Sequence, residues 1–140
     1  MKSFALLLFT CCSIGAYSQI TPASLSSMLT GNEKKEWVVT AWKLVMGTNS
    51  NNQCKDGESY VFHKDGKVDR KRCIDGRIVK DTVKWDVQRR AGDNILIMGA
   101  YEYQARAKVK STSELQLRTW VYDADKRRVL KEMILKYEKY

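Results

Sequence analysis

The sequence predicts an all-β protein, a small eight-stranded antiparallel up-and-down barrel with a short N-terminal helix. Residues 101–110 alternate strictly between apolar or small and polar side chains, which is typical of an antiparallel strand with one buried face. Seven further segments have strand character, and short turn-forming stretches connect most of them. Closing such a meander into a barrel removes its unpaired edges.

The N-terminal 18 residues have the features of a secretory signal peptide. Lys2 precedes an apolar run from Phe4 to about Gly15 that is too short to span a bilayer, and a small-x-small triplet follows at residues 16–18. We predict cleavage after Ser18 and one domain over residues 19–140, exported to the periplasm, the outer membrane or the exterior. The alternative is lipoprotein processing at Cys11 or Cys12. No later segment is apolar enough to form a transmembrane span.

A short helix is expected directly after the signal peptide. Pro22 suits a first helical turn, Leu25, Met28 and Leu29 follow at helical spacing, and Gly31 provides a stop. The predicted strands are residues 36–46, 59–63, 67–73, 82–90, 94–99, 101–110, 114–123 and 127–138. The last of these also fits a helical spacing, but the turn sequence at residues 123–126 and a two-residue periodicity favour a strand.

Asp65-Gly66 separates two of these strands and predicts a two-residue hairpin turn with positive φ at both residues. Pairing of Lys64 with Lys67 would then place Glu58 opposite Cys73. The polar stretch at residues 47–57 is the one long connection, and long loops at a barrel mouth often carry binding sites.

Cys54 and Cys73 are the two cysteines of the mature chain, and in an oxidising compartment such a pair indicates a disulfide. No metal site is expected, because His63 is the only histidine and each Asp-Gly pair supplies too few carboxylates for calcium. No cofactor motif or nucleophile elbow is present either, so the sequence predicts a protein that is not an enzyme.

The chain is basic, with a net charge of +9 that falls to +8 when Lys2 is removed with the signal peptide. Such a charge favours anionic surfaces or ligands as partners. We predict a basic surface, continuous if the strands that carry it are neighbours, made by Arg70, Lys71, Arg72, Arg106 and Lys108. It could contact the anionic lipid headgroups of a membrane surface, polysaccharide or an acidic envelope partner protein, or be a solvated face without a partner, which is the commoner case. Nucleic acid is not expected, because the chain is exported and offers only Trp120 and Tyr122 as exposed stacking aromatics.

Several aromatic side chains are expected inside the barrel. They either fill its core, the commoner arrangement in so short a chain, or line a cavity for a small ligand. The predicted ligand-binding residues are Trp42, Tyr60, Phe62, Trp85 and Tyr103, and Tyr101 belongs to the same interior set.

The order and spacing of motifs between residues 29 and 118 resemble the lipocalin-like domain of secreted and outer-membrane-associated proteins of Bacteroidota. The matching positions are Leu29-Thr30-Gly31, Trp37, Cys54, Asp56, Tyr60, Phe62, Asp65-Gly66, Cys73, Trp85 and Leu115. The Gly-x-Trp signature of true lipocalins is absent, since Gly31 and Trp37 are six positions apart, and residues 68–73 are unusually basic. The resemblance implies a calyx-like barrel. We therefore expect a secreted binding module for a small apolar or amphipathic ligand, or alternatively an accessory subunit of an envelope complex.

Overall fold

A computed structural model describes residues 17–18, 20–45, 54, 57–108, 113–123 and 125–137. Its strands are β1 (Tyr17–Ser18), β2 (Lys34–Val45), β3 (Ser59–His63), β4 (Lys67–Ile74), β5 (Arg77–Arg90), β6 (Asp93–Met98), β7 (Tyr101–Lys108), β8 (Glu114–Tyr122) and β9 (Arg128–Lys136). The helix α1 spans Pro22–Thr30. The predicted signal peptide, the lipidation sites and most of the loop at residues 47–57 lie outside the described residues.

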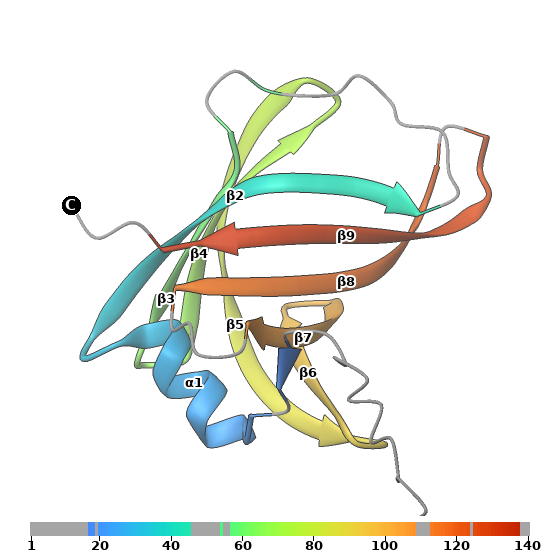
Figure 1. The fold of residues 1–140 in the computed structure, drawn as a ribbon. Coiled ribbons are helices and arrows are strands. Elements are labelled where there is room, and N and C mark those ends of the chain that lie inside the picture. The colour runs from blue at the N-terminus through green and yellow to red at the C-terminus, as the bar shows by residue number, and fades with distance from the viewer. Residues whose placement is uncertain are drawn as a thin grey trace, which may run out of the picture.

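The strands from β2 to β9 form a closed antiparallel barrel (Figure 1). Each strand pairs with the next along the chain, and β9 pairs with β2 to close the sheet. The all-β, eight-stranded, up-and-down prediction is therefore confirmed, including the choice of a strand for β9. The two-residue β1 adds to β7 at Ala107 and Lys108.

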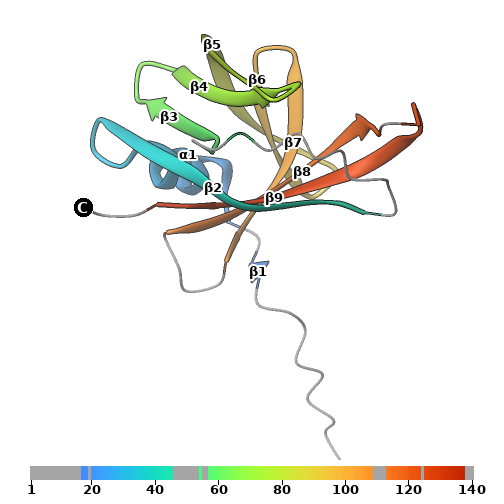
Figure 2. The same ribbon diagram turned by 90° about the horizontal axis from the view of Figure 1, so that it is seen from above.

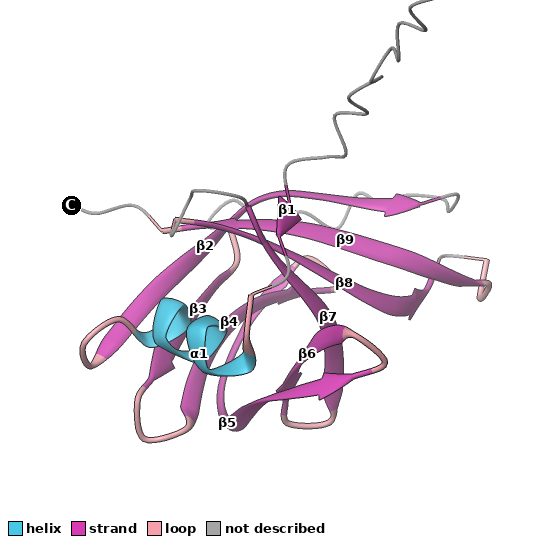
Figure 3. Ribbon diagram, turned by 60° about the horizontal axis from the view of Figure 1, so that its bottom comes forward, coloured by secondary structure: helices cyan, strands magenta, loops and turns pink. Residues whose placement is uncertain are grey.

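The helix α1 lies across one end of the barrel (Figures 2 and 3). Thr21 caps it by accepting a hydrogen bond from the backbone N–H of Ser24 at 3.1 Å, and Pro22 begins it. Leu25 and Leu29 are fully buried in the core. The indole N–H of Trp37 donates to the Leu29 carbonyl at 3.0 Å, so a strand side chain satisfies one free carbonyl of the helix C-terminus.

The interior next to α1 is tightly filled. The side chains that pack there beside Leu25 and Leu29 are almost completely shielded from solvent: Trp37, Phe62, Val68, Leu96, Met98, Leu115, Leu117 and Leu135. They come from six of the eight barrel strands, and alternation along each strand directs them inward. The barrel therefore has one closed, packed end.

The β3–β4 turn differs from the prediction. Phe62 pairs with Val68, a register one residue away from the predicted one, and only Gly66 of the Asp65-Gly66 pair has positive φ, at 84°. The Asp65 carboxylate accepts a hydrogen bond from the Lys67 N–H at 3.1 Å, which stabilises a longer loop in which Asp65 keeps an ordinary backbone conformation.

The predicted type of turn is found instead at Asp75-Gly76, between β4 and β5. Ile74 pairs directly with Arg77, and φ is 50° at Asp75 and 74° at Gly76. This is the two-residue geometry that Asp-Gly sequences favour. It also explains why β5 begins at Arg77 instead of at residue 82.

Candidate functional site

An open cavity of about 690 Å³ occupies the end of the barrel opposite α1. It lies between the C-terminal halves of β2, β4 and β8 and the first residues of β3, β7 and β9. The apolar and aromatic part of its wall is formed by Val39, Trp42, Tyr60, Tyr103, Val121 and Met133. The barrel is therefore packed at one end and hollow at the other. The cavity volume is within the range of small-molecule sites.

A β-bulge in β2 directs Trp42 into this cavity. The pairing of β2 with β9 shifts by one residue between Val39 and Ala41. Because side chains alternate along a strand, Trp37 and Trp42, five positions apart, would otherwise point to opposite sides of the sheet. The bulge at Thr40 brings both indoles inside, Trp37 into the packed end and Trp42 into the cavity wall.

The structure divides the five predicted ligand-binding residues into two groups. Trp42, Tyr60 and Tyr103 line the cavity. Phe62 and Trp85 instead pack against each other near α1, with their ring centroids 5.5 Å apart in an edge-to-face contact. Of the interior set, Tyr101 lies at the cavity rim and is 50% exposed.

The two tyrosines of the cavity wall keep their hydroxyl protons at neutral pH. Burial raises the pKa of Tyr103 to about 12, and burial also raises the pKa of Tyr60 well above its usual value. Nearby Arg70 and Arg72 oppose this shift without cancelling it. Both phenols therefore keep a hydroxyl hydrogen-bond donor.

The predicted basic surface is only partly correct. The Arg70 side chain is 5% exposed and lies inside the barrel wall, where its guanidinium holds Asp81 through two hydrogen bonds of 2.8 and 2.6 Å. Arg72 faces the cavity and donates from Nη2 to the same carboxylate at 2.9 Å. Alternation along β4 explains this, because Val68, Arg70 and Arg72 occupy the same face.

Arg106 and Lys108 lie on β7, separated from β4 by β5 and β6. Each is near a carboxylate of its own: Arg106 is 4.0 Å from Asp93, and Lys108 is 3.3 Å from Glu114. The five basic residues therefore do not form a single patch. The strand order separates them.

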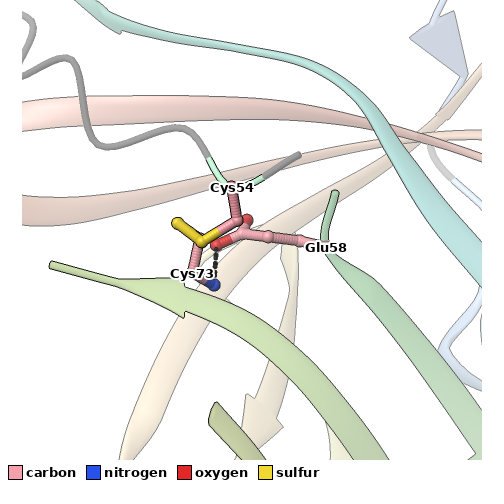
Figure 4. The surroundings of a disulfide bond; sticks show 3 residues. All are labelled: Cys54, Glu58 and Cys73. Carbon is pink, nitrogen blue, oxygen red and sulfur yellow. Dashed lines mark hydrogen bonds between the residues drawn. A yellow bond between two sulfur atoms is a disulfide. The ribbon is translucent and has the colours of Figure 1, made fainter. Parts of the chain in front are cut away.

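Cys54 and Cys73 form the predicted disulfide, with their Cα atoms 5.7 Å apart (Figure 4). The bond ties the residue-54 segment to β4, and both cysteines line the cavity. The Glu58 carboxylate lies beside the disulfide and accepts a hydrogen bond through Oε1 from the Cys73 N–H at 2.9 Å.

Oε2 of Glu58 and Nε of Arg72 belong to residues that line the cavity, but both atoms are shielded from solvent and have no hydrogen-bond partner in the part of the chain that the structure describes. The sequence interpretation did not select Glu58 as a site residue. The signal for it was its even position before Tyr60 and Phe62, which gives it the same inward phase directly before β3.

Exposed apolar residues gather near the same end of the barrel. Trp120 and Tyr122, on the outward face of β8, are 58% and 75% exposed. The Arg128 guanidinium lies 5.0 Å from the centre of the Trp120 ring. Both side chains are exposed, as their phase in the sequence predicts, and Tyr122 also lies at the cavity rim.

Within the described residues, no group of three or more His, Cys, Asp and Glu side chains is arranged to hold a metal ion. The His63 ring is 2.7 Å from the Asp69 carboxylate on the outer face of the barrel. The same part of the chain contains no helix with the length and apolar character of a membrane span. No family model, curated protein or solved structure matches the chain.

Proposed function

We propose that this chain is an exported, non-enzymatic binding module that holds a small apolar or amphipathic ligand in its barrel, in the manner that the lipocalin-like resemblance implies. The observation that carries the proposal is the contrast between the two ends of the barrel. Side chains fill one end completely, whereas the other keeps a cavity of about 690 Å³ behind an aromatic wall. A fold that needed only a core would gain stability by filling that space.

The chemistry of the cavity is suited to binding. Trp42 and Met133 offer apolar contact, and the hydroxyls of Tyr60 and Tyr103 offer hydrogen bonds. The two cysteines at the rim are joined in a disulfide and so offer no thiol nucleophile. A disulfide is also what an exported chain retains.

Binding can be tested with N-phenylnaphthylamine, an uncharged probe whose fluorescence rises in apolar surroundings. We expect saturable binding by the mature oxidised protein and markedly weaker binding by Val121→Trp, which places a larger side chain in the cavity wall. Val45→Trp is the matched control, because Val45 lies at the same end of the barrel, on its outer side. Equal probe binding by both variants, or no saturable binding by the unmodified protein, would contradict the proposal.

A second candidate function is docking to a partner protein of the cell envelope. The exposed pair Trp120 and Tyr122, with Arg128 against Trp120, favours it, because aromatic and arginine side chains are enriched in interface centres. An untagged pull-down from native envelope should then capture a partner that Trp120→Ser/Tyr122→Ser loses and that Ile74→Ser, at another exposed apolar position, retains. Recovery of the protein as a free monomer would argue against it.

A further inference from the structure

We infer that the ligand is an amphipathic molecule with a singly charged anionic head group, such as a carboxylate, which the ammonium group of Lys131 binds near the mouth of the cavity. This inference rests on the proposed ligand-binding function and specifies the class of ligand. Its basis is the position of Lys131, a cationic side chain in the cavity wall beside the aromatic ring of Trp42. Lysine side chains that point into a protein are usually paired with a negative charge, so this one indicates an anionic ligand.

The register of β9 directs Lys131 into the barrel. β9 lies between β2 and β8 (Figure 1), where Lys131 pairs with Leu44 on one side and with Thr119 on the other. Both of these neighbours line the cavity, as does Met133, which has the same inward phase two positions further along β9. The Lys131 side chain is half-buried, so part of it remains accessible. Because the side chain points inward, that accessible part faces the open cavity.

The positive charge of Lys131 is not compensated within the part of the chain that the structure describes. No ion pair joins it to a carboxylate there, and its Nζ lies 5.1 Å from the centre of the Trp42 ring. The face of an indole attracts an ammonium group but carries no net charge. Trp42 therefore helps to fix the position of the cation and leaves its charge for an anion that binds beside it.

The carboxylates of the lining are not placed to serve as this anion. The Asp123 side chain is 0% exposed, and its Oδ1 accepts the N–H of Arg127 at 2.8 Å. Glu58 accepts the N–H of Cys73 through Oε1, and its other oxygen is shielded from solvent. Asp75 is exposed in the turn between β4 and β5. Its charge at the rim disfavours a multiply charged ligand, and this is why we specify a single negative charge.

Arg72 is the other cation of the lining, and its charge is already matched. Its Nη2 donates to the Asp81 carboxylate at 2.9 Å, and the arginine side chain is 17% exposed. Lys131 therefore differs from Arg72 in having a charge that a ligand can compensate.

The direction of β9 predicts how the ligand lies. The strand begins with Arg128 at the open end and runs toward α1, so Lys131, Met133 and Leu135 follow one another from the mouth to the packed end. A head group at the level of Lys131 leaves the apolar part of the ligand further inside, against Trp42 and Met133. The ligand should therefore enter with its apolar end first.

Displacement of N-phenylnaphthylamine by decanoic acid and by decanamide tests this inference with the mature oxidised protein at neutral pH. The two compounds share an apolar chain and differ in the head group, which is an anion in one and an uncharged amide in the other. Moving a carboxylate out of water costs more than moving an amide, so a preference for decanoate requires a positive charge in the cavity. We expect decanoate to displace the probe at about a tenfold lower concentration, the effect of one charge-assisted hydrogen bond.

Three variants assign the preference to Lys131. Lys131→Met removes the charge and keeps an apolar side chain of similar length, so it should lose the preference for decanoate and still bind the probe. Lys131→Arg keeps the charge and should keep the preference. Lys136→Met is the matched control, because it changes the net charge equally at an exposed, outward position of the same strand, and it should also keep the preference. Thermal unfolding and retained probe binding show that the variants are folded.

The outcomes separate the two proposals. If the probe binds but decanoate displaces it no better than decanamide, or neither compound displaces it, the inference about the head group is wrong and the binding function stands. The same conclusion follows if Lys131→Met keeps the preference for decanoate. If the probe does not bind to the unmodified protein, the proposed function is contradicted together with this inference.

Discussion

Arg70 and Asp81 form a two-bond ion pair across β4 and β5, with Nε 2.8 Å from Oδ1 and Nη2 2.6 Å from Oδ2. The guanidinium also donates from Nη1 to the Met98 carbonyl at 3.3 Å. The arginine side chain is 5% exposed and the aspartate 33% exposed. An arginine that is almost completely buried in the barrel thus depends on one carboxylate for its counter-charge.

Asp81→Asn should destabilise the protein by about 3 kcal/mol, because it leaves the Arg70 charge buried without compensation. The loss is measured as a change in the free energy of unfolding in urea. Glu102→Gln is the control. It removes an ion pair with Arg90 in which both side chains are about half exposed, and such pairs contribute less than about 1 kcal/mol. Similar losses for the two variants would show that the inner pair has no special role.

Asp81 also makes stability depend on pH. Hydrogen bonds from Arg70 hold the pKa of Asp81 below its ordinary value. Its contribution to stability is therefore complete well above the unfolded-state pKa of about 3.9 and is lost as pH falls through the folded-state pKa. Between about pH 6 and pH 3, urea midpoints should fall more steeply in the unmodified protein than in Asp81→Asn. Parallel curves would contradict this.

The disulfide should stabilise the barrel mainly by restricting the unfolded chain. Cys54 and Cys73 are 19 positions apart, and closing a loop of that length contributes about 3 kcal/mol. Cys54→Ser/Cys73→Ser should show this loss in urea unfolding and should match the unmodified protein treated with reductant. Non-reducing peptide mapping should recover the linked peptides. Free thiols at both positions would refute the pairing.

The sequence was sufficient to predict the barrel because its signals are local. Strict alternation in β7 and short connections such as Asp75-Gly76 specify neighbouring antiparallel strands, and such strands account for every pairing in the barrel except the one that closes it. The helix followed from Pro22 and Gly31 at its two ends. These features depend on residues close together in the chain.

It was harder to predict which side chains lie inside the barrel and where they leave a cavity. Arg70 and Arg72 resemble surface residues because arginine is rarely buried, and the partner that compensates them, Asp81, lies on the next strand. The cavity depends on which aromatic side chains reach the end closed by α1. Phe62 and Trp85 pack at that end, whereas Tyr60 lines the cavity. Composition alone does not predict this difference.

Ala91 offers a stabilising substitution. It occupies the first position of the β5–β6 turn with φ of 48°, a left-handed conformation that alanine adopts at a cost and asparagine tolerates better. Ala91→Asn should raise the free energy of unfolding by about 1 kcal/mol. Ala100→Asn in the β6–β7 turn is the control, because φ at Ala100 is not positive and no gain is expected. Equal effects at the two positions would contradict the turn geometry.

Deletion of Thr40 tests the β2 bulge. Without the extra residue, each side chain beyond Val39 would point to the opposite face of the sheet. Trp42 would then face outward and Lys43 inward. We expect a loss of more than about 3 kcal/mol in unfolding free energy, because an aromatic side chain loses its burial and a lysine gains it. Acrylamide should quench the fluorescence of Trp42 more strongly in the deletion variant than in the unmodified protein. The Trp42 contribution is obtained by subtracting the fluorescence of matched proteins that carry Trp42→Phe, with and without the deletion. Thr40→Val is the matched control: it removes only the hydroxyl bond to the Ile134 carbonyl at 3.3 Å and should keep probe binding. If the deletion variant binds N-phenylnaphthylamine as well as Thr40→Val does, the bulge is not what places Trp42 in the cavity wall.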